Sequence, residues 1–128
     1  MRERPLSPHL GVYRFAYTMA TSIFHRITGG ALSVGLLLLV YWLMAAADGP
    51  EAYDSAMEVL VSGFGKLVIA GFVIAFAYHF CNGIRHLNWD LGRGLERAEA
   101  RRSARTVIVA TILIAAIILL WAFGGGAA

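Results

Sequence analysis

Residues 78–90 read Tyr-His-Phe-Cys-Asn-Gly-Ile-Arg-His-Leu-Asn-Trp-Asp and close the second of three long apolar segments. On a helix of about 3.6 residues per turn, one narrow stripe of this stretch holds His79, Gly83, His86 and Asp90. Contact of such a stripe with lipid would be costly, because hydrocarbon offers no partner to imidazole or carboxylate groups. We therefore expect the stripe to face another helix, a cofactor or water.

The composition excludes an ordinary soluble domain. Of the 128 residues, 59% are hydrophobic and only 15% are charged, which is too few to make a polar surface. Three uncharged segments are each long enough to cross a hydrocarbon core of about 30 Å. We predict an all-α integral membrane protein with a single domain, residues 1–128, and three transmembrane helices at approximately residues 27–47, 66–87 and 106–123.

The distribution of charge predicts how the chain lies in the membrane. The arginines lie before the first span, or at the end of the second span and beyond it, whereas the first connection carries Asp48, Glu51, Asp54 and Glu58. By the positive-inside rule, the N-terminus and the second connection are cytoplasmic and the C-terminus is outside. The net charge of +3 therefore reflects topology, and we expect membrane lipid rather than nucleic acid as a partner.

The segments before and between the spans give weaker signals. Residues 1–13 contain two prolines and a glycine, which favour an extended cytoplasmic arm, either a docking strap for a soluble partner or a frayed terminus. The sequence Asp-Gly-Pro-Glu predicts a helix start capped by Asp48. A short amphipathic helix is then expected over residues 52–62, ended by Gly63 and Gly65.

The remaining segments carry no clear chemistry. Residues 91–105 are rich in arginine, which indicates a loop that sets topology beside anionic lipid or seats a partner protein. The third span, residues 106–123, is predicted to be a lipid-facing brace without a site. The single cysteine, Cys81, is expected to be a small packing residue.

His79 is the strongest candidate for chemistry. It lies six residues before Arg85 and therefore about 9 Å deeper than the cytoplasmic end of its helix. An imidazole at that depth can ligate a haem iron, with Gly83 leaving space for the porphyrin edge. The alternative is a histidine hydrogen-bonded across helices. A second axial ligand would come from His25 reaching inwards or from another polypeptide, and three spans are few to enclose a haem, which favours a heteromeric helix bundle.

A second group of candidate residues lies at the start of the first span. Ser22 and Arg26 are four residues apart and share a helix face near the cytoplasmic boundary. A hydroxyl donor and a fixed cation suit the carbonyl oxygens of a quinone, which gain negative charge on reduction. Alternatively, Arg26 snorkels and Ser22 caps the helix or faces water. Small residues then favour close approach of a helix or a flat ligand: Thr28, Gly29, Gly30 and Ser33.

Two separated motifs resemble the cytochrome b membrane-anchor subunits of succinate dehydrogenase. They read Ser-Ile-Phe-His-Arg-Ile-Thr-Gly at residues 22–29 and His-Phe-Cys-Asn-Gly-Ile-Arg-His-Leu-Asn-Trp-Asp at residues 79–90, and residues 4–10 resemble that family as well. The resemblance implies a complex of a flavoprotein subunit, an iron–sulfur subunit, this chain and a second three-span membrane anchor. It also implies that electrons pass from succinate through iron–sulfur clusters to ubiquinone.

The resemblance further implies roles for individual side chains. His79 would be one axial ligand of haem b, and the second anchor would supply the other histidine. His25 and Arg26 would lie near the haem propionates. The quinone would contact Ser22 and Arg26, together with a tyrosine of the second anchor. Two further residues are expected near the quinone or its proton supply: His86 and Asp90.

Three functions remain open at the level of sequence. The first is a haem- and quinone-binding anchor of a succinate:ubiquinone oxidoreductase. The second is an anchor of a fumarate reductase that uses menaquinol. The third is a non-enzymatic membrane scaffold or transporter half. We expect no succinate oxidation by this chain alone, because it offers no dicarboxylate, flavin or cluster-binding site. The absence of a transit sequence before Arg2 predicts a bacterial inner membrane, although a processed mitochondrial chain would look alike.

Overall fold

The computed structural model describes residues 17–125, and this range is helical apart from short connections. Its helices are α1 (Tyr17–Asp48), α2 (Pro50–Val61), α3 (Gly63–Asp90) and α4 (Arg97–Phe123). Helices α1, α3 and α4 are each long and apolar enough to cross a membrane. The predicted all-α fold with three spans is therefore confirmed. The arm predicted at residues 1–13 lies outside the described range.

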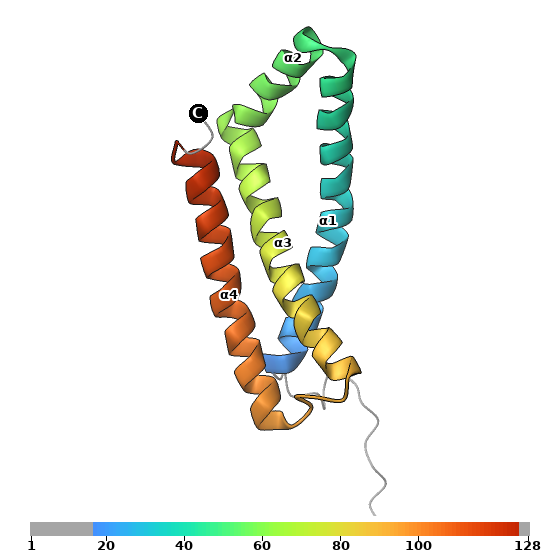
Figure 1. Cartoon of the computed structure of the whole chain (residues 1–128), viewed down its shortest axis with the longest axis vertical. Helices are drawn as coiled ribbons and strands as arrows, with labels where there is room; N and C mark the ends of the chain where they lie inside the picture. The colour runs from blue at the N-terminus through green and yellow to red at the C-terminus, as the bar shows by residue number, and fades with distance from the viewer. Residues whose placement is uncertain (1–16, 126–128) are drawn as a thin grey trace, which may run out of the picture.

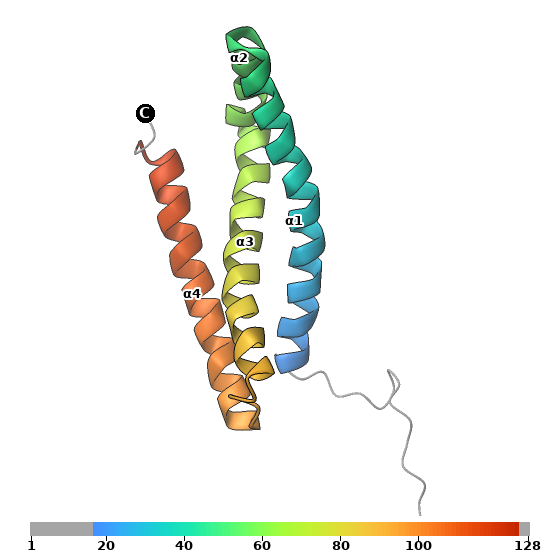
Figure 2. The same cartoon turned by 45° about the vertical axis from the view of Figure 1, so that its right-hand side comes forward.

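Helix α3 is the centre of the arrangement. It lies between α1 and α4, while the short helix α2 crosses one end and joins α1 to α3 (Figures 1 and 2). Helices α1 and α3 are close together where α1 begins and diverge towards α2 (Figure 1). The start of α1 and the end of α3 consequently share one end of the bundle with the start of α4.

The helices extend past the predicted spans. A helix needs backbone hydrogen bonds but no apolar side chains, so it continues from hydrocarbon into the polar boundary. Helix α1 begins at Tyr17, before the predicted span at residues 27–47, and so includes the motif at residues 22–29. Helix α4 begins at Arg97, so the arginine-rich segment predicted as a loop is mostly helical. The true connection between α3 and α4 covers only residues 91–96.

The predicted start of the short helix is wrong by one residue. Asp48 ends α1, and the N-cap of α2 is Gly49, without a side-chain capping hydrogen bond. Gly49 has φ 119°, a conformation that side-chain-bearing residues rarely adopt, so the tight turn between the two helices requires glycine here. Pro50 then occupies the first turn, as its fixed φ favours.

The predicted end of the short helix also needs correction. Helix α2 ends at Val61, and Gly63 and Gly65 belong to α3. The Ser62 side chain accepts a hydrogen bond from the Gly65 backbone N–H at 3.1 Å, so Ser62 caps the start of α3. A Cβ atom on Gly65 would overlap the carbonyl oxygens of the last turn of α2. Gly65 therefore allows α2 and α3 to meet closely at the turn between them, and it does not end a helix as predicted.

Among the described residues, the core is small and made mainly of alanine. The buried apolar side chains are Ala45, Ala56, Ala77, Ala100, Ala104, Val107 and Ala115. Small residues let helix backbones approach closely, as is usual between helices in membranes. The large apolar side chains are mostly exposed, where lipid or another chain can cover them.

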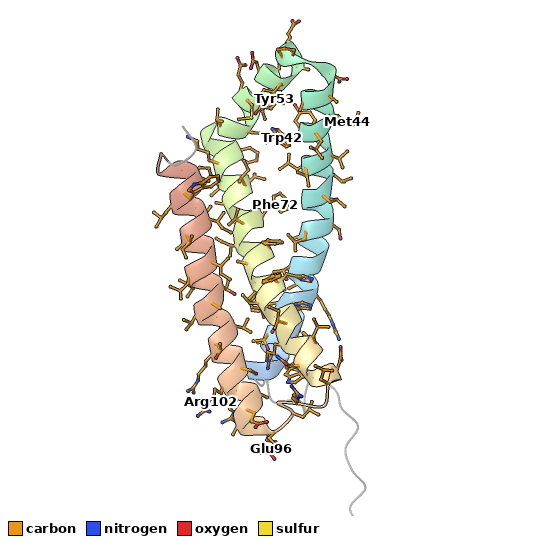
Figure 3. The ribbon with its side chains drawn as sticks, viewed as in Figure 1. Trp42, Met44, Tyr53, Phe72, Glu96 and Arg102 are labelled. Atoms are coloured by element: carbon orange, nitrogen blue, oxygen red, sulfur yellow. The ribbon has the colours of Figure 1, made fainter. Side chains whose placement is uncertain are left out.

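An apolar cavity of about 1130 Å³ lies where α1 and α3 diverge below α2. Figure 3 shows Trp42 and Phe72 in the space between these helices. Phe72 packs so tightly against Gly35 of α1 that a Cβ atom there would lie 2.8 Å from its Cδ1. The three spans thus make close contact locally but do not fill the space between them.

We predict that Gly65→Ala lowers the free energy of unfolding by about 1–3 kcal/mol, because the new methyl group meets backbone atoms that cannot rotate away. Gly63→Ala is the matched control, since a Cβ atom at Gly63 has no neighbour within 4 Å. The measurement is a denaturant titration of the detergent-solubilised protein, followed by helical circular dichroism. Equal effects of both substitutions would contradict this description of the corner.

Candidate functional site

His79 lies on α3 and is held by the backbone and side chains of α1. Its Nδ1 atom is 3.1 Å from the carbonyl oxygen of His25 and 3.2 Å from Oγ1 of Thr28. Because a carbonyl oxygen can only accept a hydrogen bond, the contact with His25 requires the proton to be on Nδ1. In the neutral ring this tautomer leaves the lone pair on Nε2, and that is the form of imidazole that ligates a metal.

Thr28 fixes the orientation of the same ring. Its Oγ1 atom is 2.8 Å from the carbonyl oxygen of Phe24 and 3.0 Å from that of His25, and it donates its proton to these acceptors. A lone pair of the hydroxyl group then remains to accept from Nδ1–H of His79. Two acceptors on α1 therefore converge on a single N–H group of α3.

Gly29 makes room for this contact. A Cβ atom on Gly29 would lie 3.0 Å from Cε1 of His79, whereas a Cβ atom on Gly30 would have no neighbour within 4 Å. The close approach that the small residues predicted is therefore made by the His79 ring at Gly29. The orienting role of Thr28 was missed, although its place within the motif at residues 22–29 was the available signal.

The three histidines of the described chain form a column along the α1–α3 contact. The His25 and His79 rings are stacked, with centroids 4.0 Å apart and planes 5° from parallel. The His86 ring is 4.8 Å from that of His25, and the Trp89 ring is 5.0 Å from that of His86. The nitrogen lone pairs of an imidazole lie in the plane of its ring, so two stacked parallel rings do not direct their nitrogen atoms at a common metal position. The stacking therefore gives no support to the expectation that His25 reaches inwards as a second ligand.

Two nitrogen atoms in this column are buried without a hydrogen-bond partner among residues 17–125. They are Nδ1 of His25 and Nε2 of His86. Buried polar atoms in proteins nearly always have a partner in the protein or in ordered water. These two nitrogen atoms are therefore candidates for contact with a group outside the described residues. Within that range, the histidines, cysteines and acidic residues form no cluster suited to a bare metal ion.

The other predicted site residues lie at the edge of the column. Ser22 is half-buried and Arg26 is exposed on α1, and neither side chain makes a hydrogen bond to another described residue. Asp90 is the last residue of α3 and is exposed. Gly83 is half-buried, and a Cβ atom there would lie 3.9 Å from Cε1 of His25. The stripe on α3 thus faces α1 at Gly83 and His79, but not at Asp90.

Arg85 has a structural role that its place in the sequence did not predict. It is only 4% exposed and donates hydrogen bonds to groups on all three long helices. Its Nη1 atom is 3.0 Å from Thr21 Oγ1 on α1 and 3.2 Å from Asn82 Oδ1 on α3. Its Nε and Nη2 atoms bond to Ser103 Oγ and the Ala100 carbonyl oxygen on α4, at 2.9 and 3.0 Å. One guanidinium group therefore ties the three spans together.

The same network fixes the beginning of α1 next to Ser22. The carbonyl oxygen of Thr21 accepts a hydrogen bond from the Tyr78 hydroxyl group at 2.6 Å, and the fully buried Asn82 donates to it at 3.5 Å. Helix α4 supplies two acceptors to this network from residues 100 and 103, which precede the predicted lipid-facing span at residues 106–123. The position of Ser22 is consequently set by α3 and α4 as well as by its own helix.

The chain is similar to a defined family of membrane proteins over nearly all of its length. The family described as succinate dehydrogenase/fumarate reductase transmembrane subunit matches residues 1–119. The succinate dehydrogenase cytochrome b556 subunit of Paracoccus denitrificans is 42% identical over 118 residues, which cover 92% of this chain and 91% of the relative. The mitochondrial cytochrome b560 subunit of Homo sapiens is 41% identical over 113 residues, which cover 87% and 67%. The cytochrome b556 subunit of Rickettsia typhi is 36% identical over 119 residues, which cover 93% and 91%.

We predict that Arg85→Lys lowers the free energy of unfolding by about 3 kcal/mol, because the shorter ammonium group keeps the charge but cannot reach acceptors on three helices. The matched control is Arg93→Lys at an exposed position, where we expect a change within about 0.5 kcal/mol. The measurement is again denaturant unfolding in detergent. A similar small effect for both variants would show that the network contributes little.

Proposed function

This chain belongs to the succinate dehydrogenase/fumarate reductase transmembrane subunit family, and we propose that it binds haem b and ubiquinone as the cytochrome b anchor of respiratory complex II. The observation that carries the proposal is the hydrogen bonding of His79. Its Nδ1–H is held by two acceptors on α1, so Nε2 is left as a free ligand atom. The relatives compared are named as succinate dehydrogenase subunits, which favours succinate oxidation over fumarate reduction.

The residues around His79 suit a haem. Neutral imidazole is a common axial ligand of haem iron, and a hydrogen bond to its second nitrogen orients the ring and raises its basicity. Gly29 gives the His79 ring space to pack against α1, whereas a Cβ atom at Gly83 would lie 3.9 Å from Cε1 of His25. Haem b, when bound, would accept and donate one electron at a time. Nε2 of His79 would hold the iron, and His25 and Arg26 would lie near the propionates, Arg26 as a fixed cation.

The second axial histidine is proposed to come from a second three-span anchor. The parallel stacking of His25 on His79 supports this, since His25 does not approach from the opposite side. The exposed apolar side chains of the long helices also support it, because a second helical chain can cover them. A flavoprotein subunit and an iron–sulfur subunit complete the proposed assembly and carry out succinate oxidation.

Ubiquinone is proposed to bind beside Ser22 and Arg26. A hydroxyl group and a guanidinium group at the boundary stabilise the negative charge that develops on the quinone oxygens during reduction. Their lack of partners among the described residues leaves both groups available to a ligand. The Arg85 network holds the neighbouring residue, Thr21, and so positions Ser22. His86 and Asp90 are proposed to serve the quinone or its proton supply.

The proposed location is a bacterial inner membrane, with the N-terminus in the cytoplasm. The beginning of α1 and the α3–α4 connection lie at the same end of the bundle (Figure 1), and most of the arginines flank this end. The positive-inside rule therefore supports a cytoplasmic position for that end. Bacterial subunits from Paracoccus denitrificans and Rickettsia typhi are among the similar proteins, which supports a bacterial membrane.

For the haem site, we predict that His79→Ala abolishes the b-type absorbance in dithionite-reduced minus oxidised spectra of the purified complex. Gly29→Ala should shift this spectrum or lower the haem content, because its Cβ atom would press on the His79 ring. Gly30→Ala is the matched control and should match the wild type, since its Cβ atom meets nothing within 4 Å. A full b-type spectrum from assembled His79→Ala complex would remove the ligand assignment.

For the quinone site, we predict that Arg26→Gln slows succinate-dependent ubiquinone reduction about 100-fold, because a cation facing the developing charge is lost. Succinate oxidation by a soluble dye should stay near the wild-type rate, since that reaction takes place in the soluble subunits. Arg93→Gln, which removes the same charge from the α3–α4 connection, should leave both rates unchanged. Parallel loss of both activities in Arg26→Gln would instead indicate failed assembly.

A further inference from the structure

The outward side of α4 carries a shallow cavity of about 750 Å³ that is open to the surroundings, is lined by residues of this helix alone and plays no part in the site described above. One end is lined by Arg101, Arg102 and Arg105, and the other end by Val109, Ala110 and Leu113. No acidic side chain lines it. The cavity therefore combines a strongly cationic end with an apolar end on a single helix.

The cavity lies on the side of α4 that the three-helix bundle does not use. The buried residues of this helix are Ala100, Ala104, Val107, Thr111 and Ala115. By contrast, the three arginines that line the cavity are exposed, and Figure 3 shows Arg102 at the lower end of α4, pointing away from α3. This arginine-bearing side is open to whatever surrounds the protein.

The order of residues along α4 places the cavity at a membrane boundary. Arg105 is the last charged residue before an uncharged segment that runs to the end of the chain. From Arg105 to Leu113 the helix rises about 12 Å, so the apolar wall extends well into the hydrocarbon. A ligand that fills the cavity would have its negative charge at the boundary and its apolar part among lipid tails.

We propose that this cavity is a binding site for an anionic phospholipid. The phosphodiester group would lie among the three arginines, which donate to phosphate oxygens in a planar, often bidentate manner. One acyl chain would lie against the apolar wall, where the small side chain of Ala110 provides depth. A free phosphate ion would use only the cationic end, and a zwitterionic lipid would bring its own cation towards the arginines. The site is independent of the proposed haem and quinone chemistry.

The test uses the purified complex with all its subunits in dodecyl maltoside. Isotopically labelled dioleoyl phosphatidylglycerol or dioleoyl phosphatidylcholine is titrated in, and bound lipid is counted by native mass spectrometry. We expect the wild type to bind phosphatidylglycerol at least tenfold more tightly than phosphatidylcholine. Arg102→Gln combined with Arg105→Gln should weaken phosphatidylglycerol binding about 30-fold, since each cation near a lipid phosphate contributes roughly tenfold or somewhat less.

The matched control is Arg93→Gln combined with Arg97→Gln, which removes the same charge beside the cavity but not from its lining. This variant should keep phosphatidylglycerol binding within about threefold of the wild type. Equal loss in both double variants would overturn the site, because it would indicate diffuse attraction to the basic end. Displacement of the lipid by equimolar inorganic phosphate would also overturn it. So would loss of a protein subunit, rather than lipid, from the variant altered at residues 102 and 105.

Discussion

The arrangement of the three spans depends on a charged group that is almost completely enclosed. A guanidinium group removed from water is costly unless its N–H groups find acceptors. Arg85 meets this requirement with acceptors from α1, α3 and α4. Because these acceptors come from separate helices, the group is satisfied only when all three helices are in register. The need of the Arg85 guanidinium group for acceptors thus fixes how the three helices pack, although their apolar contacts are mostly between small residues.

The candidate site is built directly on that register. Thr21, which accepts from Arg85, lies one residue before Ser22 and one turn before His25, whose carbonyl oxygen faces His79. The geometry that leaves one nitrogen of His79 free is therefore a consequence of how α1 is seated on α3. Helix α4 affects the site through the same guanidinium group, although it contributes no side chain to the histidine column. The site and the bundle are stabilised by one connected set of hydrogen bonds.

The membrane spans and the candidate histidine could be predicted from the sequence, because each depends on residues that are close together in the chain. Segments without charge predicted the three spans, which are confirmed. A histidine within such a segment pointed to His79, whose role as a haem ligand stays a prediction. The partners of Arg85 could not be predicted, since they come from distant positions and acceptors such as the Ala100 carbonyl group have no side-chain signature. The start of α4 was also missed, because hydropathy locates the hydrocarbon boundary, whereas α4 begins at Arg97, beyond that boundary.

The alanine-rich core has a consequence for how the protein is made. A chain that hides so few large side chains gains little from folding alone within the membrane. Newly inserted copies of this chain would therefore stay accessible to membrane proteases until other subunits of the complex cover them. The cellular level of this subunit would accordingly follow the supply of its companion more closely than its own rate of synthesis.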